Sequence, residues 1–385
     1  MSNLPKGWEK VFLKEVVQDM HQGINTVTEN IEYYDNGIDI LQAKHITSGY
    51  IDLSDPKKVS IEDYNKYKAK YQPQINHILL TNIGTIGKVL IVEENIDFLI
   101  AWNIFLIKSN QLKINPHFLF YVLKKYDIDK FYDKFLTGNA TKFINKKFMG
   151  DIEIPLPPLE EQKKIADILS TVDKKIAFVE ENINATEELK KGLMQKLLTE
   201  GIGHTEFKDS ELGRIPQGWE LKTLGELVFI LTDYTANGSF ASLKENVTYF
   251  NEANFAALVR TTDLKKKEFK PERFTDKRGY EFLKKSALYG GEILMANVGS
   301  IGEVYIVPEV DFPMTLAPNM YLIKYNDNLI NTYAYYFMNS SIFINQLLSK
   351  IASTTLQAVN KANFKSIKIP LPPLEEQKKI ADILS

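Results

Sequence analysis

The stretch IPLPPLEEQKKIADILS occupies residues 154–170 and recurs without a change at residues 369–385, an offset of 215 positions. Self-similarity at a fixed offset is the first sign of an internally repeated architecture. This offset is far larger than the roughly 20–45 residues of a solenoid repeat. We therefore predict two copies of one complete domain.

Weaker similarities along the chain keep nearly the same offset and the same order. The paired motifs are PKGWE at 5–9 and PQGWE at 216–220, NIGTIG at 82–87 and NVGSIG at 297–302, AWN at 101–103 and APN at 317–319, and NK at 145–146 and 360–361. The segment at 154–170 is identical in both copies, whereas the residues before it have diverged. This contrast indicates a shared mechanical part attached to two surfaces with different tasks.

Apolar runs and paired glycines predict the local structure of each copy. The expected strands are 78–81 and 89–92 in the first copy and 293–296 and 304–307 in the second, each pair flanking a Gly-x-x-Gly turn at 84–87 or 299–302, with helices at 116–125 and 332–339. Strands and helices in one domain predict a mixed α/β, or α+β, fold class. The two repeated domains are expected to be separated by a long coiled-coil helix.

The helix follows from a change of periodicity after Pro158. Apolar side chains then recur every third or fourth residue, at Ile165, Ile168, Val172, Ile176, Val179, Ile183, Leu189, Leu193 and Leu197. Pro157 and Pro158 suit the first helical turn, and Gly201 is a plausible stop. About 40 residues would form a rod of about 60 Å. A helix of this kind needs a partner to cover its apolar stripe.

Composition narrows the class of protein. The chain has no cysteine, which excludes disulfides, thiolate metal sites and a cysteine nucleophile. It has neither an N-terminal signal core nor an apolar run long enough to cross a membrane, so we expect a cytoplasmic protein. A net charge of -2 leaves DNA binding open, because binding needs local basic clusters and not a basic total.

Signatures of catalysis are missing from the sequence. The run GTIGK at 84–88 is too short for a phosphate-binding loop, and its counterpart at 299–303 ends in Glu, so both are interpreted as turns. Glu160 and Glu161, like Glu375 and Glu376, are neighbours that point about 100° apart on a helix, so each pair is expected to stabilise a helix start. The five histidines lack ligand spacing. No catalytic residue and no metal site are predicted.

A domain, a PLPPLEEQ motif and a long helix, followed by the same again, resemble the specificity subunits of type I restriction-modification enzymes. The resemblance covers essentially the whole chain and is most specific at residues 154–162 and 369–377. It implies that each variable domain recognises one half of a split double-stranded DNA sequence, and that the helical regions pair as a spacer and dock methyltransferase subunits. It also implies that S-adenosylmethionine, ATP and magnesium belong to the methyltransferase and restriction/translocase subunits, so that this chain is not catalytic.

The repeat and the resemblance divide the chain into four segments. They are a first target-recognition domain at 1–153, a spacer helix at 154–203, a second target-recognition domain at 204–368 and the start of a second helix at 369–385. Family members normally complete that second helix. The partner of the first helix therefore stays open between a longer form of this chain, self-association with another copy, and a methyltransferase subunit.

Candidate DNA-binding residues come from basic clusters outside the helix and from aligned positions that differ in chemistry. They are Gln42, Lys44, His45, Lys57, Lys58, Lys142 and Lys146 in the first domain, and Arg260, Thr262, Asp263, Lys265, Lys266, Arg273 and Arg278 in the second. Aligning 41–46 with 259–264 places Gln42 opposite Arg260 and His45 opposite Asp263. Two domains that read different half-sites should differ at such positions.

All four arginines lie after residue 213. The first domain therefore lacks the bidentate Arg–guanine pair, and its half-site is predicted to lean toward adenine, while the second should contain at least one Arg-read guanine. Two rival classes are an enzyme with its own recognition domains and a coiled-coil assembly protein. The missing catalytic motifs argue against the first rival, and the divergent, lysine-bearing domains argue against the second.

Overall fold

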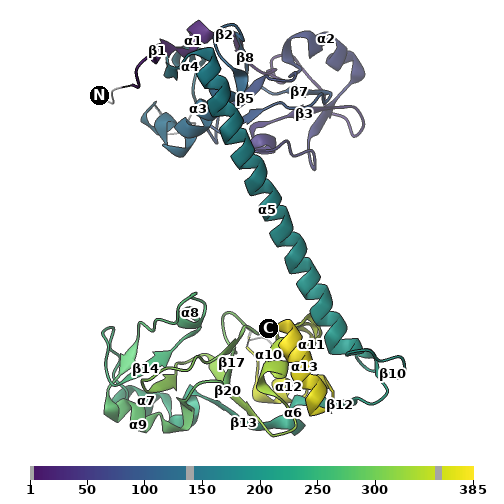
Figure 1. Ribbon diagram of the computed structural model, residues 1–385, viewed down its shortest axis with the longest axis vertical. Coiled ribbons are helices and arrows are strands. Elements are labelled where there is room, and N and C mark those ends of the chain that lie inside the picture. Colours follow the sequence, from purple (N-terminus) through teal and green to yellow (C-terminus); the bar gives the residue numbers. More distant parts are fainter. Residues whose placement is uncertain (1–3, 136–142, 352–357) are drawn as a thin grey trace. The chain divides into compact units, whose positions relative to one another are not determined.

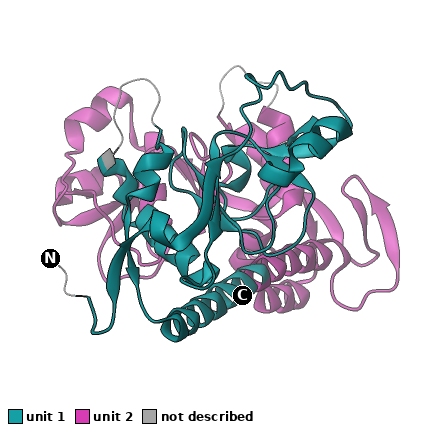
Figure 2. Cartoon of the chain, turned by 90° about the horizontal axis from the view of Figure 1, so that it is seen from above, with its two compact units in different colours: residues 1–181 teal, residues 182–385 magenta. Residues whose placement is uncertain are grey.

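The chain forms two compact units, residues 1–181 and residues 182–385 (Figure 2). The computed structural model describes residues 4–135, 143–351 and 358–385. Each unit contains both strands and helices (Figure 1), and the strand orders of their central sheets correspond, so the predicted duplication of a mixed α/β domain is confirmed. Of the candidate residues, Lys142 lies outside the described residues.

A four-stranded antiparallel sheet forms the centre of each unit. In unit 1 its order is β2 (Val17–Gln22), β8 (Ile104–Ser109), β5 (Ile78–Thr81) and β6 (Val89–Ile91); in unit 2 it is β13 (Val228–Asp233), β20 (Met320–Tyr325), β17 (Ile293–Ala296) and β18 (Val304–Ile306). Both faces of the central strands are buried. Ile78 and Leu80 face one core, while Leu79 between them faces a second core, as the alternation of side chains along a strand requires.

A smaller sheet packs against that second core. It comprises β4 (Lys57–Val59), β3 (Ile38–Leu41) and β7 (Phe98–Ile100) in unit 1, and β15 (Phe274–Thr275), β14 (Ala256–Val259), β19 (Met314–Leu316) and β16 (Ala287–Leu288) in unit 2. The pairs β3–β7 and β14–β19 are parallel. Short helices and turns surround this sheet, namely η1 (Ala43–Ile46), α2 (Ile61–Tyr71), η3 (Tyr234–Asn237), α7 (Phe240–Asn246), α8 (Thr261–Leu264), α9 (Lys277–Phe282) and η4 (Lys284–Ser286).

A two-stranded ribbon joins the beginning and the end of each domain. Its strands are β1 (Glu9–Phe12) with β9 (Glu153–Leu156), and β12 (Glu220–Thr223) with β21 (Lys368–Leu371). Helices complete the core on this side, as α1 (Leu13–Val16), α3 (Pro116–Ile128), η2 (Phe131–Phe135) and α4 (Lys146–Gly150) in unit 1, and α6 (Leu224–Leu227), α10 (Asn331–Met338), α11 (Ser341–Ile351) and α12 (Lys361–Lys365) in unit 2. Unit 2 also contains the hairpin β10 (Phe207–Ser210) and β11 (Gly213–Pro216).

The long helix is α5 (Leu159–Glu200), which spans 42 residues, and its counterpart in unit 2 is α13 (Leu374–Leu384). Gly201 follows α5 with a φ of 67°, which confirms the predicted stop. The expected placement of Pro157 and Pro158 in the first helical turn is wrong, because α5 begins at Leu159 and both prolines precede it. No helix in the described residues is long and apolar enough to cross a membrane.

The Gly-x-x-Gly segments are turns in both units. Gly84, Gly87, Gly299 and Gly302 all have φ values between 77° and 87°, in the left-handed region that favours glycine. A side chain at Gly87 would collide with the Tyr132 ring. The interpretation of these segments as structural turns is therefore confirmed.

Candidate nucleic-acid interface

One turn follows a central strand of the small sheet in each unit and carries the aligned candidate positions. In unit 1 the backbone N–H of Gln42 donates to Nδ1 of His45 at 2.9 Å. In unit 2 the N–H of Arg260 donates to a carboxylate oxygen of Asp263 at 3.1 Å. The two turns are therefore closed in the same way, and the sequence alignment pairs structurally equivalent residues.

His45 and Asp263 point into the protein. Their exposed fractions are 2% and 0%. The second ring nitrogen of His45 lies 3.1 Å from the carbonyl oxygen of Asp55, to which it donates, since Nδ1 is an acceptor. Burial lowers the pKa of His45, because the charged imidazolium is poorly solvated there. Both side chains thus cap their turns, and their burial leaves neither exposed for a base contact.

Arg260 is held by acidic neighbours. Its Nε and Nη2 donate to the two carboxylate oxygens of Asp263 at 3.1 and 2.7 Å, and Nη2 also reaches Glu272 at 3.1 Å. The hydrogen bonds with Asp263 raise the pKa of Arg260. Since Asp263 is fully buried, this fork fixes the turn, and most of the donors of Arg260 are already occupied.

Four of the predicted lysines form ion pairs. These are Lys44 with Asp55 at 3.1 Å, Lys58 with Asp39 at 4.0 Å, Lys265 with Glu303 at 2.8 Å, and Lys266 with Glu272. Pairs exposed to solvent contribute only about 0–1 kcal/mol, so a phosphate can replace the acid at little cost. Contacts between these lysines and DNA therefore stay predictions, although the acids reduce the local positive charge.

The remaining candidates have fewer internal partners. Among the described residues no acid pairs with Lys57, Lys146 or Arg273, and Arg278 donates to the amide oxygen of Asn246 at 3.0 Å. The counterpart of Lys146 in unit 2 is Lys361, which pairs with Asp233 at 2.7 Å. Unit 1 has Gln22 at the position of that acid, so among the described residues the lysine of unit 2 forms an ion pair and that of unit 1 does not.

Two adjoining cavities in unit 2 surround Tyr249. One, of about 480 Å³, is lined by Arg260, Thr262, Arg273, Ser300 and Asn319, among others. The other, of about 540 Å³, includes Phe240, Lys244 and Asp233. Phe240 is largely exposed. Basic groups interleaved with exposed aromatic rings are typical of surfaces that bind nucleic acids, so we take this region as the candidate interface of unit 2.

Comparison with known families decides the identity of these domains. The family model described as "Type I restriction modification DNA specificity domain" matches residues 5–188 and residues 216–385. The chain belongs to this family. Its two units therefore each contain one DNA specificity domain, and DNA recognition is the function of the family.

Relatives of known name are similar along most of the chain. The putative type I restriction enzyme MjaX specificity subunit of Methanocaldococcus jannaschii is 31% identical over 99% of this chain and 87% of its own length. The MjaVIII specificity subunit of the same organism is 31% identical over 77% of this chain and 73% of its own length.

Two solved structures from type I restriction-modification systems have the same fold. The type I restriction-modification S subunit from M. genitalium superposes with a TM-score of 0.56 at 16% identity, covering 100% of this chain and 90% of the other. A chain from a study of complex assembly and conformational transition of the type I R-M system superposes with a TM-score of 0.57 at 19% identity, with the same coverage.

The helix between the two specificity domains keeps its apolar stripe exposed in the middle. From Ile168 to Leu193 the stripe residues have exposed fractions between 39% and 71%. At its ends the stripe packs inward, because Ile165 contacts the core of unit 1 and Leu197 is buried in that of unit 2. The expected need for a partner along the middle of the helix is consistent with this exposure and stays a prediction.

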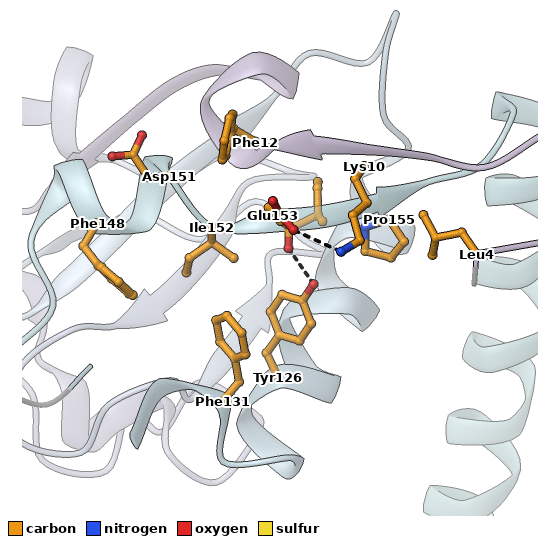
Figure 3. A pocket seen from close by; sticks show the side chains of 11 residues that line it. Leu4, Lys10, Phe12, Tyr126, Phe131, Phe148, Asp151, Ile152, Glu153 and Pro155 are labelled. Carbon is orange, nitrogen blue, oxygen red and sulfur yellow. Dashed lines mark hydrogen bonds and ion pairs between the residues drawn. The ribbon is translucent and has the colours of Figure 1, made fainter. Parts of the chain in front are cut away.

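A further cavity of about 540 Å³ lies beside the β1–β9 ribbon of unit 1 (Figure 3). Its wall is aromatic, with Phe12, Tyr126 and Phe148, and an ion pair of 3.1 Å between Lys10 and Glu153 crosses its rim. Burial raises the pKa of Tyr126 to about 12, so its hydroxyl stays protonated and donates to the carbonyl of Glu153 at 2.7 Å. The sequence singled out none of these residues, and the ion pair with Glu153 neutralises Lys10 at the rim.

Among the described residues no group of three or more His, Asp or Glu side chains could hold a metal ion.

Proposed function

We propose that this chain is the DNA-recognition subunit of a type I restriction-modification enzyme and that each unit reads one half of a bipartite target. The observation that carries the proposal is one specificity fold present twice, with different chemistry at equivalent surface positions. Gln42 in unit 1 corresponds to Arg260 in unit 2, and Lys146, which has no ion pair among the described residues, corresponds to ion-paired Lys361. Two domains with the same fold but different side chains at equivalent positions would select two different half-sites.

The test is to express the chain with methyltransferase subunits of its system and to map methylated DNA by sequencing. We expect two short specified blocks separated by a fixed gap of unspecified bases. Methyltransferase subunits without the chain serve as the control and should give no sequence-specific methylation. A single continuous site, or methylation that does not depend on sequence, would contradict the proposal.

We further propose that α5 sets the gap between the two half-sites and that its exposed stripe docks a helical partner. Inserting four residues, about one helical turn, near position 181 adds about 6 Å, or nearly two base pairs at 3.4 Å each. The recognised gap should lengthen accordingly. A variant with four residues replaced at the same place, without insertion, should keep the original gap. If the insertion also left the gap unchanged, α5 would not set the distance between the half-sites.

In this proposal the chain acts in the cytoplasm, uses no cofactor of its own and has no catalytic role. S-adenosylmethionine would be bound by methyltransferase subunits, and ATP and magnesium by restriction/translocase subunits. The names of its relatives, all specificity subunits, support this division of labour. Purified chain incubated with DNA, magnesium and S-adenosylmethionine should neither methylate nor cleave. Activity of the chain alone would contradict this part of the proposal.

A further inference from the structure

The edge strand of the small sheet places one basic residue at the same point in both units. In unit 1, Lys57 on β4 lies opposite Ile40 of β3. In unit 2, the carbonyl oxygen of Arg273, just before β15, accepts the backbone N–H of Leu258 in β14 at 2.9 Å. Ile40 and Leu258 occupy the same position in the corresponding strands β3 and β14. Lys57 and Arg273 lie opposite these two residues, so they are equivalent.

A tyrosine is equivalent in the two units as well. Isolated bridges join Tyr34 to Lys58 in unit 1 and Phe250 to Phe274 in unit 2. The residues that precede them, Tyr33 and Tyr249, therefore occupy matching positions beside the basic residue. Both the tyrosine and the basic residue are 216 positions apart between the units.

In each unit the cation stacks on the tyrosine. Nζ of Lys57 lies 4.1 Å from the ring centroid of Tyr33, and Cζ of Arg273 lies 5.5 Å from that of Tyr249. The hydroxyl of Tyr33 donates to Thr26 at 2.9 Å, and the hydroxyl of Tyr249 lies 2.8 Å from that of Tyr234. Each ring is thus anchored at its far end, and both rings remain partly exposed. Stacking on a fixed ring holds the cation in place before any ligand arrives.

These two cations differ from their neighbours because they lack acidic partners in the described chain. Arg260 is held by Asp263, and Lys58 lies 4.0 Å from Asp39. In contrast, Nε of Arg273 is buried and has no hydrogen-bond partner within residues 4–135, 143–351 and 358–385. An unsatisfied buried donor is unfavourable in the free protein. The cavity of about 480 Å³ next to it also offers the hydroxyls of Thr262 and Ser300.

We propose that residues 57 and 273 are corresponding base-reading positions of the two specificity domains, and that Arg273 reads a guanine in the half-site of unit 2. The inference rests on the proposed function, in which each unit reads one half-site. The planar guanidinium can donate two parallel hydrogen bonds to O6 and N7 of guanine in the major groove. Lys57 offers a compact ammonium instead, so unit 1 should discriminate less strictly at the corresponding base.

The competing interpretation is that both cations contact phosphates. A phosphate contact supports affinity for all sequences alike, whereas a base contact changes the preference at one position. Exchanging the two residue types separates these outcomes, since both variants keep the positive charge.

The experiment uses the full chain in complex with its methyltransferase subunits and selects bound sequences from a library of randomised duplexes. For Arg273→Lys we expect the preference for guanine at one position of one half-site to fall by about tenfold or more, with the other half-site unchanged. For Lys57→Arg we expect one position of the other half-site to become more strictly guanine. Arg273→Gln should shift the unit 2 position toward adenine, and it provides a second variant if Arg273→Lys folds poorly.

Arg214→Lys is the matched control. Arg214 stacks on the ring of Phe207 at 5.2 Å in the hairpin β10–β11, so it has the same kind of contact outside the small sheet. This variant should leave both half-sites unchanged. The inference is overturned if Arg273→Lys weakens binding to all sequences equally, or if no position changes its preference. In both cases the wild-type complex still selects a bipartite target, so the proposed function stands; if the wild type selects no sequence, the proposed function fails first.

Discussion

The identical segments 154–170 and 369–385 adopt the same local structure in two different surroundings. Gln162 and Gln377 are both fully buried and make the same contacts. Each side-chain oxygen accepts the backbone N–H of Asn115 or Ile330, at 2.8 and 2.9 Å, and each amide donates to a proline carbonyl two residues before the helix starts, at 2.8 and 2.9 Å. The glutamine therefore fixes the helix to its own domain in both units.

The identical neighbours of this glutamine differ sharply in burial and hydrogen bonding between the two units. Glu161 is exposed, whereas Glu376 accepts hydrogen bonds from the N–H of Ile202, from the ring of His204 at 2.7 Å and from the indole of Trp219 at 3.0 Å. Likewise, Leu169 is 38% exposed and its copy, Leu384, only 4%.

The cause of the difference is the end of α5. Leu197 and Leu198 lie in the core of unit 2 together with Trp219, Ile380 and Leu384. In the described part of unit 1, no equivalent helix end packs against residues 154–170. The comparison teaches that the sequence of this segment determines its conformation and its glutamine contacts, while its burial depends on what packs against it.

The largest difference in stability loss between the two units should appear at the equivalent isoleucines, Ile380 and Ile165. Ile380 is fully buried and Ile165 only partly. Ile380→Ala should destabilise unit 2 by about 3 kcal/mol, because a full side chain is lost from a packed core. Ile165→Ala should cost unit 1 about 1 kcal/mol, in proportion to its smaller burial. Urea unfolding of the intact chain, followed by pulsed hydrogen exchange, resolves the two units. Equal losses would show that the end of α5 does not cover α13.

The glutamine should give the same result in both units. Gln162→Ala and Gln377→Ala each leave a partly buried N–H without its side-chain acceptor, which costs about 2 kcal/mol. We expect both variants to shift the unfolding of their own unit by similar amounts in the same measurement. The exposed neighbours provide the controls, since Lys163→Ala and Lys378→Ala should have little effect. A loss in one unit only would contradict the idea that the two segments share this anchor.

Substitution of the equivalent glutamates, Glu376 and Glu161, should also affect the stability of the two units differently, by a smaller amount. Glu376→Ala removes an acceptor used by three donors and should destabilise unit 2 by about 1–2 kcal/mol. Glu161→Ala, the same substitution in the exposed copy, should change the stability of unit 1 by less than about 0.5 kcal/mol. If Glu376→Ala were equally silent, the hydrogen bonds to Trp219 and His204 would contribute nothing to holding the helix end.

A pH dependence provides a further contrast between the two units. Burial, together with nearby Lys108, lowers the pKa of His77 in unit 1 to about 4. The unfolded chain binds this proton near pH 6.5 and the folded chain only near pH 4, so unit 1 loses stability as the pH falls through that window. The equivalent residue in unit 2 is Glu292, which pairs with Lys324.

We expect unit 1 to unfold at a lower urea concentration at pH 5 than at pH 7.5. His77→Gln should reduce this difference, and the unfolding of unit 2 in the same samples should not respond to the substitution. An unchanged pH dependence in the variant would show that His77 is not its source.

Much of the fold was predictable because its signals are local. The strands at 78–81 and 293–296 match β5 and β17, since short apolar runs bounded by glycine turns define them. The repeat predicted the duplication, and the 3.6-residue periodicity predicted α5 together with its stop at Gly201. The helix expected at 116 begins there, as α3, whereas α5 begins at Leu159, after Pro157 and Pro158, because prolines suit both the first turn and the residues before it.

The candidate site was less predictable because its residues are brought together by the tertiary structure. His45 and Asp263 were aligned correctly, but a polar residue in a turn can contact a ligand or cap the backbone, and only burial separates the two roles. The role of Asp263 as the partner of Arg260 was missed for the same reason. Tyr33 and Tyr249 were missed although they keep an offset of 216 positions, the same as Lys57 and Arg273. That shared offset is a usable signal once the strand register is known.

The most direct test that each unit recognises one half-site is to give both units the same recognition domain. A chimera would carry residues 216–368 in place of residues 5–153, with α5 and the following domain unchanged. Methylated sites mapped by sequencing, in complex with the methyltransferase subunits, should then contain the half-site of unit 2 twice, separated by the original gap. Persistence of the original half-site of unit 1 in the recognised sequence would contradict the account.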